Sequence, residues 1–401
     1  MINNSHSKEK GSALVLAVLA ALVLMVTGVG ILGLGVRGRI QAIRDSEQVE
    51  ARCAADAGLE KAVYEMNQQL ATNTWGTSSL PLAASQSLPN SSATFDHKVV
   101  QGTGKNKADY IASSTGNRGS AQKTVVGLLR LQGPFDSALV VKQTLVMKTG
   151  SVVDGYNYEN GESDLRVVTL STLGSQVTLG PGSLINGDVA VGVGGDPSVV
   201  ISASPGSIQG KSYALTEEVW LPSVTVPASI DSLPSAGTIK GPATLTISGK
   251  CDTISATKGD IIIDGPVTLY VTGDISLGNS SQMQINKDNP DASLTLFLGG
   301  NLYVKNGGVI NNLTQDPTRL KIYGLDSCVN LSLAATGAFY GAVYAPEAEM
   351  NLKSSVEIYG AVVVKIFNQG SSANFHYDAA LRKLTPYDLF TRFVVKRWSE
   401  Q

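Results

Sequence analysis

The sequence has few charged residues, few cysteines and few histidines. Lys, Arg, Asp and Glu make up 16% of the 401 residues, against about a quarter in an ordinary globular domain. A formal net charge of −2 gives no electrostatic reason to expect a nucleic-acid partner. Three cysteines are too few for a disulfide scaffold. The sequence leaves open whether Cys251 and Cys328 pair in an oxidising compartment or remain buried free thiols.

Charge is absent altogether between Ser12 and Val36, where every residue is apolar or small. As a helix this run is about 37 Å long, enough to cross a hydrocarbon core of about 30 Å. A cleaved secretory signal has a shorter apolar region of about 7–15 residues and ends at a small-residue cleavage site. The run here is longer and leads directly into Arg37 and Arg39. It therefore predicts a membrane anchor.

The helix is expected to continue beyond the membrane. No proline interrupts the sequence up to Leu70, and apolar positions such as Ala51, Ala55, Leu59 and Ala62 recur at helical spacing. We therefore predict one helix over residues 12–70. Counting positive charges would place the C-terminal side in the cytoplasm, whereas the low-charge, strand-rich remainder favours an exported C-terminal part.

The stretch "QVEARCAADAGLEKAVYEM" resembles the "A-x-x-A-A-E-A-G-L-E-x-A" signature of PilX-type minor pilins. It reads here from Ala51 to Ala62, with Asp56 at the usual glutamate. The basic leader "SKEKG" before the apolar run is also similar to the class III leader of type IV pilins. The resemblance implies other pilin subunits as partners through the helix, and residence in the inner membrane before assembly.

The same resemblance implies cleavage by a prepilin peptidase between Gly11 and Ser12, which would remove residues 1–11 as a leader peptide. Major pilins carry phenylalanine first and glutamate fifth after this bond. Here those positions are Ser12 and Leu16. The missing glutamate is shared with tip subunits of this class and argues against a major repeating subunit.

Residues 71–134 are expected to hold a linker and a small antiparallel sheet. The first part, 71–96, is rich in Ser, Thr, Asn and Pro without periodicity, which favours an exposed connection. Three strand-like runs follow, separated by Gly and Asn turns. They predict a sheet laid against the helix.

Residues 135–384 alternate short Val-, Ile-, Leu- and Thr-rich runs with glycine turns. This texture is typical of a parallel β-helix, or β-solenoid, in which successive strands must stack to bury their inward side chains. A β-sandwich is the alternative, because turns such as Asn186-Gly187 and Asp264-Gly265 also suit hairpins. A proline-containing insert, 213–237, predicts a strap along the surface. The spacing of Leu389, Phe390, Phe393 and Trp398 predicts a C-terminal capping helix over 385–401.

The pieces "FYGAVYAPEA", "EIYGAVVVK" and "HYDAAL" resemble a pattern found in large bacterial domains attached to PilX-type helices. They stand at 339–348, 357–365 and 376–381. The resemblance implies a surface-exposed β-solenoid with no assigned reaction.

Catalytic chemistry on this domain is expected to be absent. Glycoside hydrolysis needs two facing carboxylates, and the candidates are Asp188, Asp260, Asp264 and Asp274. Each lies beside a glycine near a turn, where an aspartate side chain bonds local backbone.

Two further leads come from titratable and oxygen-bearing side chains. His376 with Asp378 could serve acid–base work, although a structural histidine is the simpler interpretation. A calcium site is conceivable where Asp154, Asn157, Asn160 and Asp164 converge, but the spacing differs from an EF-hand loop. The sequence predicts no cofactor or metal.

The sequence therefore predicts a mainly β protein on a long N-terminal helix, acting as a minor pilin-like subunit in pilus assembly or adhesion. Its C-terminal domain would be exported and would reach the pilus or cell surface. A membrane-anchored enzyme or lectin acting on surface polysaccharide is the alternative. A signal-anchored surface protein without a filament is a third possibility.

Overall fold

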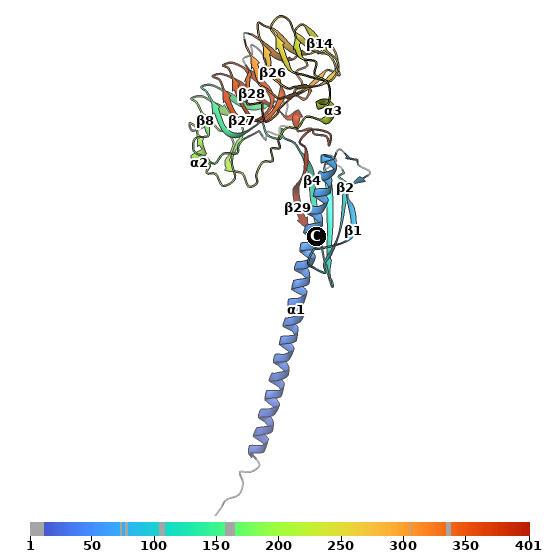
Figure 1. Ribbon diagram of the computed structural model, residues 1–401. Coiled ribbons are helices and arrows are strands. Elements are labelled where there is room, and N and C mark those ends of the chain that lie inside the picture. The colour runs from blue at the N-terminus through green and yellow to red at the C-terminus, as the bar shows by residue number, and fades with distance from the viewer. Residues whose placement is uncertain are drawn as a thin grey trace, which may run out of the picture. The chain divides into compact units, whose positions relative to one another are not determined.

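The computed structural model describes residues 12–72, 74–76, 79–103, 109–156, 165–305, 307–333 and 338–401. The chain forms two compact units. The first, here the helical unit, comprises Met1–Leu131 and Arg392–Gln401; the second, the stack unit, comprises Gln132–Thr391. Leader residues 1–11 lie outside the described residues. The predicted combination of a long N-terminal helix, a mainly β chain and parallel sheets is confirmed (Figure 1).

The helical unit is built on α1 (Ser12–Ala71), a single unbroken helix of 60 residues. A five-stranded sheet accompanies the C-terminal part of this helix in the order β1-β2-β3-β4-β29. Its strands are β1 (Leu82–Ser87), β2 (Thr94–Gln101), β3 (Tyr110–Arg118), β4 (Ala121–Gln132) and β29 (Arg392–Glu400). The pairs β1–β2, β2–β3 and β3–β4 are antiparallel. Their buried faces enclose a core with Leu59, Met66, Val99, Leu129 and Phe393.

Two expectations for this unit are wrong. The C-terminal helix predicted for 385–401 is absent, because residues 392–400 form strand β29 beside β4. Phe393 faces the core and Val394 is half-buried, whereas residues 395–400 are exposed. The strand is therefore anchored by one buried aromatic side chain, and the helical spacing of the apolar residues is coincidental. The connection predicted for 71–96 contains β1, and β2 begins within it at Thr94.

The stack unit consists of short parallel strands laid in register, wound in two series. The first series comprises β5 (Leu139–Met147), β6 (Val152–Tyr156), β7 (Arg166–Thr169), β8 (Val177–Leu179), β9 (Leu184–Ile185), β10 (Asp188–Val191), α2 (Pro197–Val200), β11 (Ile201–Ser202) and β12 (Ser212–Ala214). The second comprises α3 (Ala228–Asp231), β13 (Thr238–Lys240), β14 (Ala243–Leu245), β15 (Gly249–Cys251), β16 (Thr253–Ala256), β17 (Ile261–Ile263), β18 (Pro266–Val271), β19 (Ile275–Leu277), β20 (Gln282–Ile285), β21 (Ser293–Leu298), β22 (Leu302–Val304), β23 (Val309–Asn312), η3 (Pro317–Arg319), β24 (Leu320–Gly324), β25 (Asn330–Leu333), β26 (Ala338–Leu352), β27 (Glu357–Gln369), β28 (Asn374–Asp378) and η4 (Ala379–Arg382).

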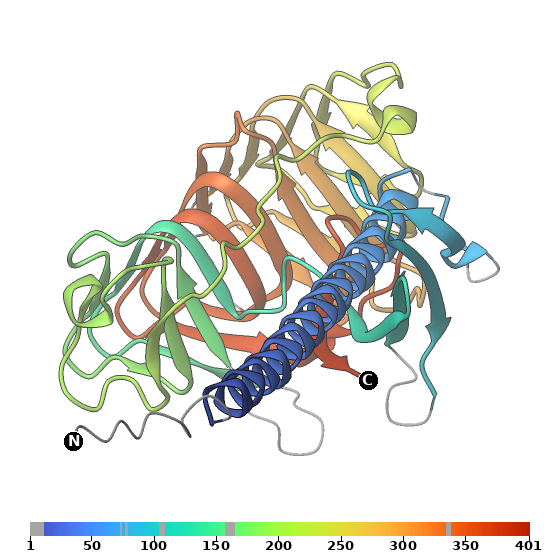
Figure 2. The same cartoon turned by 90° about the horizontal axis from the view of Figure 1, so that it is seen from below.

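The two series meet in the middle of the stack. β5 pairs with β27, and β6 pairs with β28, in parallel register. From this seam the first series runs outward to β12, and the second series begins at the other end with β13 and winds back. The segment 215–227 connects the two ends as an extended strap, which Figure 2 shows crossing the stack. Tyr344 donates a hydrogen bond from its hydroxyl to the Pro222 carbonyl at 2.7 Å and so fixes the strap to β26.

Columns of buried aliphatic side chains hold the strands together. One column crosses the seam, because the register aligns residues from eight neighbouring strands: Leu269, Leu296, Ile322, Val343, Val362, Leu139, Val167 and Val189. All eight are buried. Burying one such side chain contributes about 1.5–3 kcal/mol. The seam is therefore as apolar as the layers on either side of it.

Candidate membrane and assembly helix

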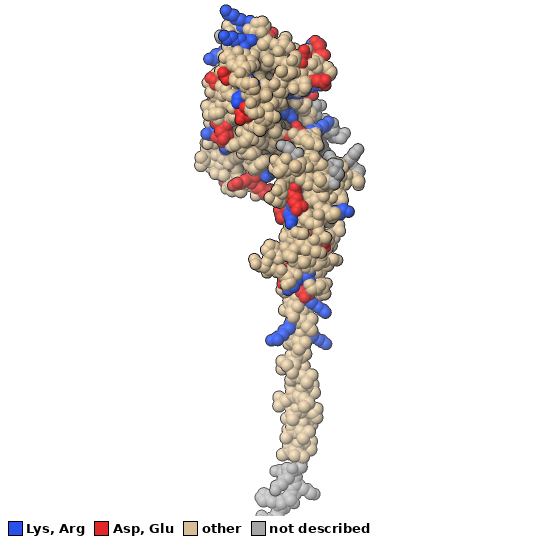
Figure 3. Space-filling view, turned by 45° about the vertical axis from the view of Figure 1, so that its right-hand side comes forward, with Lys and Arg blue, Asp and Glu red and all other residues tan. Residues whose placement is uncertain are grey.

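The N-terminal part of α1 presents an uncovered apolar surface. Leu14, Leu16 and Ile31 are 72%, 68% and 70% exposed, and Figure 3 shows no charged side chain over this part of the helix. The one hydroxyl beyond Ser12 in the run, that of Thr27, donates to the carbonyls of Val23 and Leu24 at 2.9 and 3.0 Å. The helix is long and apolar enough to cross a membrane. Its polar groups are satisfied internally, as a lipid environment requires.

Four glycines in this part of α1 have open space beside them in the described part of the structure. A Cβ atom built on Gly28, Gly30, Gly33 or Gly35 would meet nothing within 4 Å. Contacts among the described residues therefore do not explain their small size. It would allow another helix to approach closely.

The small residues of the "ARCAADAGLEKA" signature dock α1 on its own sheet. Ala51, Ala54 and Gly58 are buried, and they lie opposite β3. A Cβ atom on Gly116 of β3 would be 2.0 Å from the Ala51 carbonyl oxygen. One on Gly58 would be 2.1 Å from the Ser114 hydroxyl oxygen. Only small residues permit this approach. The small residues of the signature therefore form the contact between the helix and the sheet.

Asp56, the one residue at which this stretch departs from the signature it resembles, belongs to a polar group that joins α1 to β29. Arg52 Nε lies 3.1 Å from Asp56 Oδ2, and the same guanidinium pairs with Glu400. The guanidinium carbon also lies 4.6 Å from the Trp398 ring centroid. The sequence did not indicate that Arg52 and Trp398 lie together, because they are separated by most of the chain.

The predicted peptidase site is only partly within the described residues. Gly11 lies outside them, and Ser12 is the first residue of α1. Leu16 is exposed on the apolar surface. The cleavage assignment thus stays a prediction.

The four candidate catalytic aspartates serve the stack. Asp188, Asp260 and Asp274 stand at or just before the start of a strand, and each Oδ1 accepts a hydrogen bond from a backbone amide at the start of the neighbouring parallel strand. These amides belong to Lys211, Gln282 and Asn301, at 2.7, 2.8 and 2.7 Å. Asp264 Oδ1 instead accepts from the side-chain amides of Asn286 and Asn289, both at 3.0 Å. These side-chain hydrogen bonds lower the pKa of Asp264 below its ordinary value.

His376 has a different partner from the predicted one. Its Nδ1 lies 2.5 Å from Asp154 Oδ1 across the seam, whereas Asp378 accepts from the Ala380 amide and caps η4. The imidazole ring stacks on Tyr359 at 4.5 Å, and Tyr359 stacks on Tyr340 at 4.6 Å. The faces of Tyr359 are thus covered by its neighbours, which is how an aromatic ladder stabilises stacked strands.

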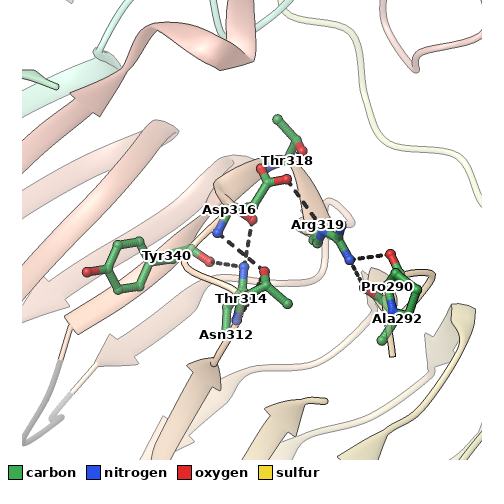
Figure 4. A network of polar contacts seen from close by, with 8 residues as sticks. All are labelled: Pro290, Ala292, Asn312, Thr314, Asp316, Thr318, Arg319 and Tyr340. Atoms are coloured by element: carbon green, nitrogen blue, oxygen red, sulfur yellow. Dashed lines mark hydrogen bonds and ion pairs between the residues drawn. The ribbon is translucent and has the colours of Figure 1, made fainter. Parts of the chain in front are cut away.

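A polar network holds the backbone of Tyr340, the last ring of this ladder. The buried Asn312 side chain donates to the carbonyls of Asp316 and Tyr340 at 2.7 and 3.1 Å (Figure 4). Arg319 donates to the carbonyls of Pro290 and Ala292 in the preceding turn. The Tyr340 ring points away from this network. The network therefore fixes the backbone that carries the ladder.

A pocket of about 500 Å³ lies beside η3 and η4. Phe135, Tyr323, Leu381 and other apolar residues form part of its lining. Asp388 Oδ1 lies 2.7 Å from Lys321 Nζ, and its Oδ2 accepts from the Thr385 amide at 2.8 Å. Asp316 Oδ1 accepts from the Thr318 amide at 3.0 Å, so both carboxylates of the lining are engaged by the protein itself.

The described residues include the three cysteines and one of the four residues proposed for calcium, Asp154. Among the described residues no three His, Cys, Asp or Glu side chains form a group that could hold a metal ion. Three of the residues proposed for calcium, Asn157, Asn160 and Asp164, lie outside the described residues. Cys251 and Cys328 are free and buried. Burial raises the pKa of Cys251 to about 11 and that of Cys328 to about 12.

Part of the chain is similar to a known protein family. A family model described as a domain of unknown function (DUF7305) matches residues 245–384, which include most of the second series of the stack. No curated protein matches the chain. Among solved structures, the competence-associated pilin ComZ from Thermus thermophilus is similar at 13% identity and a TM-score of 0.27, with 88% of this chain and 97% of that chain covered. A TM-score of 0.27 does not establish a shared fold.

Proposed function

We propose that the chain is a pilin-like minor subunit of a type IV pilus or related filament. One observation carries this proposal: a single continuous helix is apolar and uncovered over its first part and docked on its own sheet over its second. A simple membrane anchor has no need of such continuity. A subunit whose helix leaves the lipid and packs against neighbouring helices needs this continuity, because the exposed part must stay rigidly attached to the folded part.

In this mechanism the leader, residues 1–11, is removed by a prepilin peptidase between Gly11 and Ser12. The apolar helix then leaves the inner membrane and packs against helices of other subunits. The free surfaces of Gly28, Gly30, Gly33 and Gly35 suit close helix contacts. Leu16 stands where a major subunit carries glutamate, which favours a position at the tip or in low copy number.

The stack unit is, in this proposal, a β-solenoid displayed outside the cell, with a role in assembly or adhesion and no catalytic activity. In-register parallel pairing of strands with buried columns supports the solenoid. The engagement of Asp188, Asp260 and Asp274 in hydrogen bonds between strands supports a structural role for the residues that a glycoside hydrolase would need.

The decisive experiment is mass spectrometry of the N-terminus of the chain isolated from cells that carry a prepilin peptidase. The proposal predicts a chain that begins at Ser12. A Gly11→Val variant should retain residues 1–11, and a Gly33→Ala variant should be processed normally. A wild-type chain that begins at Met1, or beyond Val36, would refute the pilin assignment.

A polysaccharide-binding or polysaccharide-cleaving role is the second candidate. The Asp154–His376 pair favours it, since a carboxylate that holds Nδ1 orients the histidine for acid–base work. A screen of the purified chain against surface polysaccharides would test it. Binding or cleavage that His376→Ala abolishes and Asp378→Ala retains would support this role; equal activity in wild type and His376→Ala would exclude it.

A further inference from the structure

Three arginines follow directly after the uncharged run of α1. Arg37, Arg39 and Arg44 are all exposed. At about 100° per residue, Arg37 and Arg44 lie on one side of the helix and Arg39 on the opposite side. They span about 10 Å along the axis. Figure 3 shows blue side chains on both sides of the helix at this level. We call these three residues the arginine collar.

The collar has no counter-charge among the described residues. The nearest carboxylates along the helix have other partners: Asp45 accepts from Gln41 at 2.8 Å, Glu47 accepts from the Ser120 hydroxyl at 3.4 Å, and Glu50 pairs with Arg118 at 2.9 Å. No ion pair joins a described carboxylate to an arginine of the collar. Three exposed cations at the end of the apolar run therefore have no ion-pair partner among the described residues.

We propose that the arginine collar binds the headgroup phosphates of anionic phospholipids at the membrane surface where the helix emerges. The proposal rests on the membrane insertion assumed under the proposed function. An apolar run of about 37 Å crosses a core of about 30 Å and leaves the collar in the headgroup layer. Guanidinium groups bind phosphate oxygens in a bidentate manner, which suits lipid phosphates on both sides of the helix.

The collar gains importance once the leader is removed. Lys8 and Lys10 lie in the leader, so a chain that begins at Ser12 keeps Arg37, Arg39 and Arg44 as the side-chain cations flanking the span. Anionic lipids would then hold the helix at a fixed depth until another subunit extracts it. Each arginine near an anionic surface is expected to strengthen the attraction roughly fivefold.

Cys53 makes the test possible, because it is the exposed cysteine while Cys251 and Cys328 are buried. It lies about 13 Å beyond Arg44 along the helix. A fluorescent donor on Cys53 of the full chain in phospholipid nanodiscs would report energy transfer to an acceptor-labelled phosphatidylglycerol or, separately, to acceptor-labelled phosphatidylcholine. We expect a transfer ratio of phosphatidylglycerol to phosphatidylcholine above 1, falling to about 1 in 1 M salt, where the Debye length is about 3 Å.

The variant R37Q/R39Q/R44Q should show a ratio of about 1 while remaining inserted. The matched control K211Q/K258Q/K396Q removes three exposed lysines elsewhere and should keep the wild-type ratio. An equal ratio for wild type and the collar variant would overturn the proposal, as would failure of the chain to insert. Salt-sensitive self-association lost in the collar variant, with no lipid preference, would assign the collar to a second copy instead. A mature N-terminus at Met1 would refute the pilin assignment and leave the lipid result standing.

Discussion

At the residue scale, the aspartates beside glycines show how neighbouring strands of the stack are held in register. Asp274 Oδ1 accepts from the Asn301 amide, and Asn301 Oδ1 in turn accepts from the amides of Val329 and Asn330. The glycines before them let the backbones approach, since a Cβ on Gly300 would be 2.4 Å from the carbonyl carbon of Gly273. Glycine followed by Asp or Asn therefore combines close approach with a hydrogen bond to the next strand.

Replacing Asp274 by alanine should lower the free energy of unfolding by about 0.5–1.5 kcal/mol, because a solvent-exposed hydrogen bond between neighbouring strands is lost. Chemical denaturation of the full chain in detergent, followed by circular dichroism, would measure the change. Asp288→Ala is the control, since Asp288 is 76% exposed and pairs only with its neighbour Lys287 among the described residues. Equal stability of the two variants would contradict the role given to Asp274.

The carboxyl group of Asp388 should make the stability of the folded chain depend on pH. Burial raises its pKa, but hydrogen bonds from Lys321 and Thr385 outweigh burial, so that the pKa lies below the ordinary value of 3.8. A depressed pKa contributes stability above the unfolded value, and this contribution is lost as the pH falls through the folded value. The difference in melting temperature between wild type and Asp388→Asn should therefore be largest near pH 7 and shrink below about pH 4. A difference independent of pH would contradict this account.

At this scale, contacts between residues far apart in the sequence could not be predicted. The turn positions of Asp188, Asp260 and Asp274 were readable from their glycine neighbours. Their acceptance of amides from the neighbouring strand was not, because the pairing depends on which strands become adjacent. The same holds for His376, whose carboxylate partner is Asp154, 222 residues away, and not the nearby Asp378.

At the element scale, α1 has two parts with different chemistry in one unbroken helix. Its existence and length were predictable, because no charge or proline interrupts the run from Ser12 to Val36 and the apolar spacing continues to Leu70. What the spacing could not show is that the small residues Ala51, Ala54 and Gly58 meet β3. Strand β29 was not predicted, because several apolar residues of this segment recur at helical spacing, whereas the strand depends on the single buried side chain of Phe393.

Gly116→Val should detach or distort the sheet, since its side chain would meet backbone atoms of α1 rather than a flexible side chain. We expect a destabilisation of the helical unit of about 3 kcal/mol or more, at the upper end for overpacking. Hydrogen exchange of the β2 and β3 amides would measure it. Gly33→Ala is the control, because a Cβ atom there meets nothing within 4 Å. Unchanged β3 protection in Gly116→Val would refute the docking role of the signature.

At the scale of the whole molecule, the chain order differs from the spatial order. The stack begins in its middle with β5, reaches one end at β12, and restarts at the other end with β13. The texture of residues 135–384 predicted parallel strands, and the proline-containing insert predicted a strap. The seam between β27 and β5 was not predictable, because every buried strand presents a similar aliphatic face. The chain then returns to complete the helical unit with β29.

Deleting residues 392–401 should therefore damage the helical unit and spare the stack unit. Phe393 is 2% exposed and lies 5.0 Å from Trp75 and 5.3 Å from Tyr110 between ring centroids. Its backbone amide also donates to the Asn67 side chain at 2.7 Å. Loss of a buried phenylalanine alone costs about 3–5 kcal/mol, a large share of the stability of a small unit.

Hydrogen exchange with mass spectrometry separates the two units in one measurement. In the truncated chain, amides of β2, β3 and β4 should lose protection, whereas those of β18, β21 and β24 should keep it, because each unit has its own apolar core. The single substitution Phe393→Ala should give the same pattern at smaller amplitude, and Lys396→Ala, at an exposed position of the same strand, should leave both units unchanged. Loss of protection in β18 and β21 would show that the stack depends on β29, and retained protection in β3 would show that β29 is dispensable for the helical unit.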